Sequence, residues 1–427
     1  MRRVAVIFAL ALVAAGAGGS AGESAAVART VPKASAVLAI VEAYNGSRLL
    51  WLDPATLRPF TKRSVSLPGG AWSPVLSPAG RYVAVGGPGS VGIRIVDLRH
   101  MRVTARVAAL RYSSRRLVPL AWPERRRLLV LDSPQDARGS PEALVAIDPV
   151  AGKVVARTVR ASTAKAWADW VPTGRQLVVL SQPTEEMGSA RLVVFGPGGG
   201  ILKATDVGIV AGVWPEGPPG SRIADPGLTV DPGERRAFVV DSQTLAQVDL
   251  DTLEVSYMRL TESRSLLSRL LGWLEPAAQA KLASGFSRQA TWLGNEMLAV
   301  SGATFGGARS TPAGLYVVDA TTGATRMLEP RASAQRFSQG FLLAFGASRD
   351  GANVESGMGL AAYSREGVRL WNALGDEPVW LVETAAGYAY VPTPDEVFPR
   401  GVRVVDLSTG DVLRTVRGEM PTFVDRD

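Results

Sequence analysis

The chain has 427 residues, 46% of them hydrophobic, and its 47 Lys and Arg against 39 Asp and Glu give a formal net charge of +8. This apolar content excludes a largely disordered chain, because it is enough to build buried sheets. The absence of Cys excludes disulfides, thiolate zinc sites, thioether-bound haem and Cys nucleophiles. The single histidine, His100, excludes multi-His metal sites.

Residues 1–21 predict a secretory signal peptide. Arg2 and Arg3 precede an apolar run over 4–17, and Ala15–Ala17 offers a small-residue cleavage site, with 19–21 as the alternative. The run is shorter than the roughly 20 apolar residues that span a bilayer, so we expect cleavage, and an uncleaved anchor is the alternative. Residues 22–36 predict a flexible leader. We therefore expect a secreted or extracytoplasmic protein with no membrane span after cleavage.

The basic residues are scattered along the chain. Consecutive arginines occur at Arg115–Arg116 and at Arg125–Arg127, and Glu124 precedes the second run. Nucleic-acid binding needs basic residues gathered on one face, and export also argues against it, so we expect no nucleic-acid partner. A solvated basic surface is the simplest interpretation, and an anionic cell-wall polymer or lipid headgroup is the alternative partner.

From residue 37 onward, one pattern recurs: an apolar run, a tight turn that usually begins with Asp, and a second apolar run. Its eight copies cover residues 49–60, 93–107, 144–159, 192–207, 245–260, 315–329, 360–374 and 402–416. A further apolar run precedes each copy, and most have a third segment before that. Runs of four to seven β-branched, aliphatic and aromatic residues between turn residues indicate strands. Four strands that recur at roughly 40–50 residues predict the blades of an all-β propeller.

We label the strands of a blade A to D in chain order. The pattern predicts eight four-stranded blades in one domain over 37–427, or seven if the irregular segment 331–371 is not a full blade. The chain begins at a B strand, so the first blade lacks its A strand, and the C-terminal residues 420–426 are placed to supply it. Such closure would remove exposed sheet edges and give a monomer.

The recurring acids at the C–D turns predict turn caps rather than a metal array, because an Asp carboxylate can accept backbone N–H groups two residues on. These acids are Asp53, Asp97, Asp148, Asp249, Asp319 and Asp406. Four glycines are expected to supply the positive φ that completes the turn: Gly152, Gly200, Gly323 and Gly410. His100 occupies an equivalent turn position, so we expect it to be an exposed turn residue.

Trp122, Trp170 and Trp292 fall at one repeated position of the A strand, with Trp72 and Trp380 nearby. Bulky rings at equivalent positions predict a filling of the wedge between adjacent blades, and a stacking surface for sugars is the alternative.

One insertion interrupts the repeats near residues 262–285. Its leucines at 266, 267, 270, 271 and 274 follow helical spacing, which predicts an amphipathic helix. Such a helix would fold over a propeller face, or else dock to a partner or to a membrane surface.

The B–C and D–A loops are long and irregular, whereas the turns of the opposite face are short. These loops are 133–143, 182–190, 210–227, 302–314, 346–359 and 392–401. Loops carry binding function more often than the scaffold does, so any partner is expected on this face. Asp169, Asp225 and Glu383, on or near A strands, could approach the central channel and serve a divalent ion.

The A–B turns at 77–81, 171–175 and 230–235, followed by C–D turns of the form VVDxxTG, resemble those of the YVTN and WD-like bacterial propeller superfamily. The resemblance covers the whole mature chain and implies the fold, but this fold hosts unrelated functions. The recurring Trp-Asp ending of true WD repeats is absent. The Trp-docking pattern and Cys pair around pyrroloquinoline quinone are absent as well, which disfavours a quinone-dependent oxidoreductase.

We therefore predict a non-catalytic binding or scaffold module that recognises an envelope protein or a glycan on the B–C/D–A loop face. From the sequence we predict no catalytic residue, no set of metal ligands and no cofactor, and the binding residues stay unknown. The alternative is a metal-assisted lactonase or esterase-like hydrolase that uses the channel carboxylates.

Overall fold

The computed structural model describes residues 34–43, 45–88, 92–107, 115–134, 143–159, 168–173, 175–181, 187–213, 223–262, 285–306, 309–350, 353–394 and 401–424. Every regular element in these ranges is a β-strand, as the sequence predicts. Within the same ranges, no helix is present that is long and apolar enough to cross a membrane.

Most of these strands fall into units of four antiparallel strands that follow one another along the chain. Unit 1 consists of β35 (Thr422–Phe423), β1 (Val37–Ala43), β2 (Gly46–Leu52) and β3 (Pro59–Pro68). Unit 2 consists of β4 (Trp72–Leu76), β5 (Tyr82–Pro88), β6 (Ile93–Asp97) and β7 (Arg102–Val107). Unit 3 consists of β8 (Arg115–Glu124), β9 (Arg127–Pro134), β10 (Ala143–Asp148) and β11 (Lys153–Val159). Unit 4 consists of β12 (Ala168–Pro172), β13 (Leu177–Ser181), β14 (Gly188–Phe195) and β15 (Ile201–Val213).

The second half of the chain continues in the same way. Unit 5 consists of β17 (Gly227–Val230), β18 (Arg236–Val240), β19 (Thr244–Asp249) and β20 (Val255–Arg259). Unit 6 consists of β22 (Gly285–Gly294), β23 (Met297–Gly306), β25 (Leu315–Asp319) and β26 (Ala324–Glu329). Unit 7 consists of β27 (Ala334–Ser338), β28 (Phe341–Asp350), β29 (Asn353–Ser364) and β30 (Arg369–Ala373). Unit 8 consists of β31 (Glu383–Ala385), β32 (Tyr388–Pro392), β33 (Gly401–Asp406) and β34 (Val412–Arg417).

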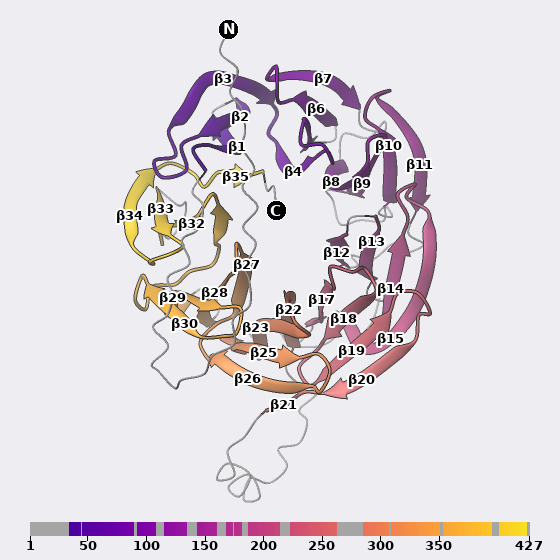
Figure 1. Cartoon of the computed structure of the whole chain (residues 1–427), viewed down its shortest axis with the longest axis vertical. Helices are drawn as coiled ribbons and strands as arrows, with labels where there is room; N and C mark the ends of the chain where they lie inside the picture. Colours follow the sequence, from indigo (N-terminus) through magenta and orange to yellow (C-terminus); the bar gives the residue numbers. More distant parts are fainter. Residues whose placement is uncertain are drawn as a thin grey trace, which may run out of the picture.

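The units are arranged around a common centre, and the yellow strands of unit 8 lie beside the indigo strands of unit 1 (Figure 1). Inner strands are buried on both faces, which explains their continuous apolar runs: β10 is buried at every residue. Outer D strands are largely exposed, as in β34. A separate apolar cluster fills the space between each unit and the next. One such cluster joins unit 8 to unit 1.

Unit 1 combines the two ends of the described chain. Its B strand, β1, pairs antiparallel with β35, placing Ala39 opposite Phe423 and Ile40 opposite Thr422. The amide of Val424 also donates to the carbonyl of Leu38 at 2.9 Å. Unit 1 therefore holds one strand from the C-terminal end of the sequence and three from the N-terminal end.

Two loops that the sequence predicts as irregular are instead strands in the described residues. Segment 302–314 continues β23 and adds β24 (Arg309–Pro312), and segment 346–359 continues β28 and β29. The B and C strands extend past the body of their units as paired hairpins, and β24 then pairs with β28 of the next unit. Backbone pairing between neighbours also occurs at β5 with β8 and at β16 (Ile223–Asp225) with β22.

The helix predicted near 262–285 concerns residues 263–284, which lie outside the described residues. Both limits of that segment are strand residues: β21 (Thr261–Glu262) precedes it, and β22 begins at Gly285.

The C–D turns are capped as predicted. In the turn of unit 6, for example, Asp319 Oδ1 accepts the amides of Thr321 at 2.8 Å and Thr322 at 3.1 Å. Gly152, Gly323 and Gly410 have the expected positive φ. The prediction for Gly200 is wrong, because Gly199 carries the positive φ in that shorter turn.

Asp97 is the most constrained of these caps. It is 2% exposed and binds the amides of Arg99 and His100, the Arg81 guanidinium at 3.0 Å and His100 Nδ1 at 3.0 Å. His100 is a half-exposed turn residue, as predicted, and its ring binds the cap. Burial raises the pKa of Asp97, but the hydrogen bonds from His100, Arg81 and the turn amides outweigh burial and hold this pKa well below its ordinary value.

This cap predicts a contribution to acid stability. Because folding lowers the pKa of Asp97, its carboxylate stabilises the fold fully above the unfolded value of about 3.9. This contribution shrinks as the pH falls below that value, and it is fully lost only below the folded pKa. We expect Asp97→Asn to lower the free energy of unfolding by about 1–3 kcal/mol at pH 7 and by less at pH 2.5. Denaturant titrations between pH 7 and 2.5 measure this difference, and a gap of constant size would contradict the assignment.

Candidate functional site

An exposed apolar and cationic surface lies on the face that the sequence favours for a partner. The D–A connection from unit 7 to unit 8, residues 374–382, buries Val379 and Val382 in the cluster between these units. It turns Trp380 (40% exposed) and Leu381 (46% exposed) outward. The guanidinium of Arg349, from the B–C hairpin of unit 7, lies 3.8 Å from the centroid of the Trp380 ring. We call residues 374–382 the Trp380 platform.

The platform rests on the backbone of β29. The amide of Gly359 donates to the carbonyl of Glu377 at 2.9 Å, and Gly359 has a φ of 67°. A Cβ at Gly357 would lie 2.3 Å from Glu377 and Pro378, so the two chain segments are in direct backbone contact. This contact and the two buried valines fix the platform and hold Trp380 in its exposed position.

A pocket of about 460 Å³ lies at the seam between unit 8 and unit 1. We call it the seam pocket. Its lining includes the end of β1 before the B–C turn of unit 1 and the D–A connection after β34, so it reaches the same face as the platform. Apolar side chains form most of its wall: Val41, Leu52, Leu57, Val402, Val416 and Pro421.

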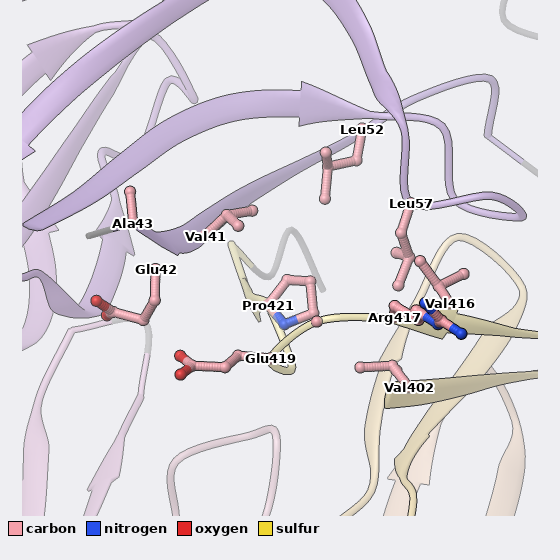
Figure 2. A pocket seen from close by; sticks show the side chains of 11 residues that line it. Val41, Glu42, Ala43, Leu52, Leu57, Val402, Val416, Arg417, Glu419 and Pro421 are labelled. Carbon is pink, nitrogen blue, oxygen red and sulfur yellow. The ribbon is translucent and has the colours of Figure 1, made fainter. Parts of the chain in front are cut away.

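Two carboxylates line one side of the seam pocket. Figure 2 shows Glu42 and Glu419 on the side of the pocket away from Leu52 and Leu57. The hydroxyl of Ser47 donates to Glu42 Oε1 at 3.0 Å. Arg417 also lines the pocket, so its charged groups are two carboxylates and one guanidinium beside apolar walls. The volume is in the usual range for ligand pockets.

No protein-family model matches the chain, and no curated protein sequence is similar to it. Among solved structures, the chain is similar to the dihydro-haem d1 dehydrogenase NirN in complex with DHE, with 15% identity, a TM-score of 0.52, and coverage of 92% of this chain and 76% of NirN. It is also similar to AztD from Citrobacter koseri, with 12% identity, a TM-score of 0.50, and coverage of 92% and 97%. Both neighbours are β-propeller proteins. The chain has a β-propeller fold. At these identities the likeness concerns the fold of the propeller and not its activity.

Two of the three acids proposed for the channel of the propeller bind different partners among the described residues. Asp225, in β16, accepts a hydrogen bond from the Ser287 hydroxyl at 2.9 Å. Glu383, in β31 of unit 8, pairs with Arg336 at 2.9 Å. Asp169 belongs to β12 of unit 4, and its side chain is outside what the structure describes. In the described part of the propeller, no group of three or more His, Cys, Asp or Glu side chains could hold a metal ion.

The tryptophans divide into two classes. Trp122 is buried between units 2 and 3, and Trp292 stacks on Phe238 with a centroid distance of 5.3 Å, so both fill wedges as predicted. The side chain of Trp170 is not among those described.

For Trp380 the wedge interpretation is wrong, because the buried neighbours Val379 and Val382 force it outward. The sequence contained a usable signal at this point. Two consecutive large apolar residues, Trp380 and Leu381, stand between valines in a D–A connection, and only the two valines are buried.

Proposed function

We propose that this protein is an exported, non-catalytic propeller that binds an envelope protein on its B–C/D–A loop face. In this proposal the eight units are the blades of one closed ring, and β35 completes the first blade. The Trp380 platform is the observation that carries the proposal. The signal peptide expected over residues 1–21 is the support for export.

The composition of the platform supports recognition of a protein. Trp and Arg are enriched among the residues that dominate binding energy at protein interfaces, and here Arg349 stacks on an exposed Trp380. Because the platform is fixed by backbone contacts, ordering it on binding costs little conformational entropy. The exposed aliphatic Leu381 favours a protein over a glycan, since sugars stack on aromatic rings and gain little from aliphatic chains.

Site-specific photo-crosslinking tests the proposal. A photoreactive amino acid at Leu381, introduced in cells of the native host, should give a light-dependent adduct with a protein of the envelope fraction. The matched control is Val368, which is 57% exposed in the C–D turn of unit 7 on the opposite face. We expect at least a fivefold stronger adduct at position 381 than at position 368.

Three outcomes would overturn parts of the proposal. Equal adducts at positions 381 and 368 would remove the assignment of the binding face. An adduct that disappears after glycan digestion would replace the protein partner with a glycan. Recovery of the protein with the cytoplasmic fraction would remove export.

A further inference from the structure

A second pocket, of about 370 Å³, lies between units 5 and 6. We call it the Arg288 pocket. It reaches the B–C/D–A face, because its lining includes the B–C turn of unit 5 and Arg259 at the end of the D strand β20. The residues that supply its polar groups are Asp241, Ser242, Gln243, Arg259, Arg288, Tyr316 and Thr325.

Arg288 is held in a fixed orientation. Its Nη1 donates to the carbonyls of Ser287 and Ala303, both at 2.9 Å, and its guanidinium lies 5.5 Å from the centroid of the Phe286 ring. Within the described residues, no carboxylate is within ion-pair distance of this guanidinium. Burial lowers the pKa of Arg288, as expected for a cation that is partly removed from water with no carboxylate beside it among the described residues.

One edge of the Arg288 guanidinium has no hydrogen-bond partner among the described residues. Nε and Nη2 make no hydrogen bond there, and the Arg288 side chain lines the pocket. Nε–H and Nη2–H are parallel donors in one plane, which matches the two oxygens of a carboxylate. A fixed and partly desolvated donor pair loses little entropy when such a group binds.

The charges of the pocket favour a single negative charge over two. Arg259 adds a second cation. Asp241 adds one anion, and its Oδ1 is occupied by the amides of Gln243 and Thr244, both at 2.6 Å. The pocket therefore has a net charge of +1, and the Asp241 carboxylate would repel a dianion such as phosphate.

We propose that the Arg288 pocket binds the carboxylate group of a ligand, through the Nε/Nη2 edge of Arg288. This site lies in units 5 and 6, whereas the Trp380 platform lies between units 7 and 8. A negative result for carboxylate binding would therefore leave the proposed function unaffected, and the reverse also holds.

Calorimetric titration of the full chain with acetate and with glucuronate tests this inference. A parallel titration with phosphate tests whether the pocket prefers a carboxylate to a dianion. We expect saturable binding of both carboxylates and at least tenfold weaker binding in Arg288→Gln, because a charged bidentate contact is lost. Arg288→Lys keeps the charge and loses the planar edge, so its affinity should be intermediate. Arg125→Gln, an exposed Arg in the A–B turn of unit 3, is the matched control and should bind like the unaltered protein.

A further variant covers the case in which Arg288→Gln fails to fold. Ala313 lines the Arg288 pocket, so Ala313→Leu fills part of it while leaving Arg288 intact, and it should also weaken carboxylate binding at least tenfold. Three results would overturn the inference: no saturable carboxylate binding, phosphate bound more tightly than acetate, or unchanged affinity in Ala313→Leu.

Discussion

Replacing Phe423 with Ala should lower the free energy of unfolding by about 3–5 kcal/mol, the usual cost of removing a buried phenylalanine. Phe423 is 8% exposed and stacks on Tyr390 of unit 8, with ring centroids 4.3 Å apart. The same residue pairs with Ala39 of β1. It therefore contacts the first and last units at once, and no other unit can supply these contacts.

Phe423→Ala should also weaken a buried hydrogen bond between units 8 and 1. Tyr390 is fully buried, and its hydroxyl donates to the carbonyl of Pro54 in unit 1 at 2.9 Å. Burial raises the pKa of Tyr390, which favours the neutral phenol that makes this bond. Removing the Phe423 ring takes away the surface that holds Tyr390 in place, and the seam between units 8 and 1 should become the first part of the fold to open.

Urea denaturation of Phe423→Ala and of the unaltered protein measures the effect. Phe60→Ala is the matched control, because Phe60 is 52% exposed on β3 of the same unit, and its loss should change stability by no more than about 0.5 kcal/mol. Deleting residues 420–427 removes β35 altogether and should give oligomers through the exposed edge of β1, visible by light scattering. A monomeric truncation of unchanged stability would show that the seam contributes nothing.

The strand pattern could be predicted from the sequence because it depends on local chemistry. Most C–D turns begin with a side-chain acceptor that caps the turn's own amides, as Asp319 does, and inner strands such as β10 are apolar because both of their faces are covered. These signals recur along the chain, so repetition made them visible. The extension of β23 and β28 as hairpins was missed, since Gly and Ser within these segments resemble loop composition.

Contacts between units could not be predicted, because different side chains make the same contact. A D-strand side chain repeatedly donates to a carbonyl in the C–D turn of the next unit: Thr158 to Gly199, Lys203 to Leu250, Arg326 to Gly367, and Trp371 to Leu407. A hydroxyl, an ammonium, a guanidinium and an indole have only the donor hydrogen in common, so no residue pattern marks the position. The Trp380 platform was missed for a related reason: its exposure depends on which neighbours are buried.

The second large effect is expected at Gly357, the point where β29 contacts the Trp380 platform. Gly357→Ala should lower the free energy of unfolding by about 3 kcal/mol, the upper end of the range for an overpacked core. The added Cβ would lie 2.3 Å from the carbonyl of Glu377 and the nitrogen of Pro378, and backbone atoms cannot rotate away as a side chain can. The φ of Gly357 lies outside the left-handed region, so an alanine there causes no backbone strain. The loss of stability therefore comes from the steric clash alone.

This substitution also separates the platform from the rest of the fold. If the platform binds the partner, its displacement should reduce the crosslink at Leu381 at least fivefold, even at temperatures where Gly357→Ala remains folded by circular dichroism. Gly198→Ala is the matched control: a Cβ there meets no atom within 4 Å, so both stability and crosslinking should be unchanged. A Gly357→Ala protein that loses stability but keeps the full crosslink would place the binding surface elsewhere, since a displaced Trp380 cannot retain its position beside Arg349.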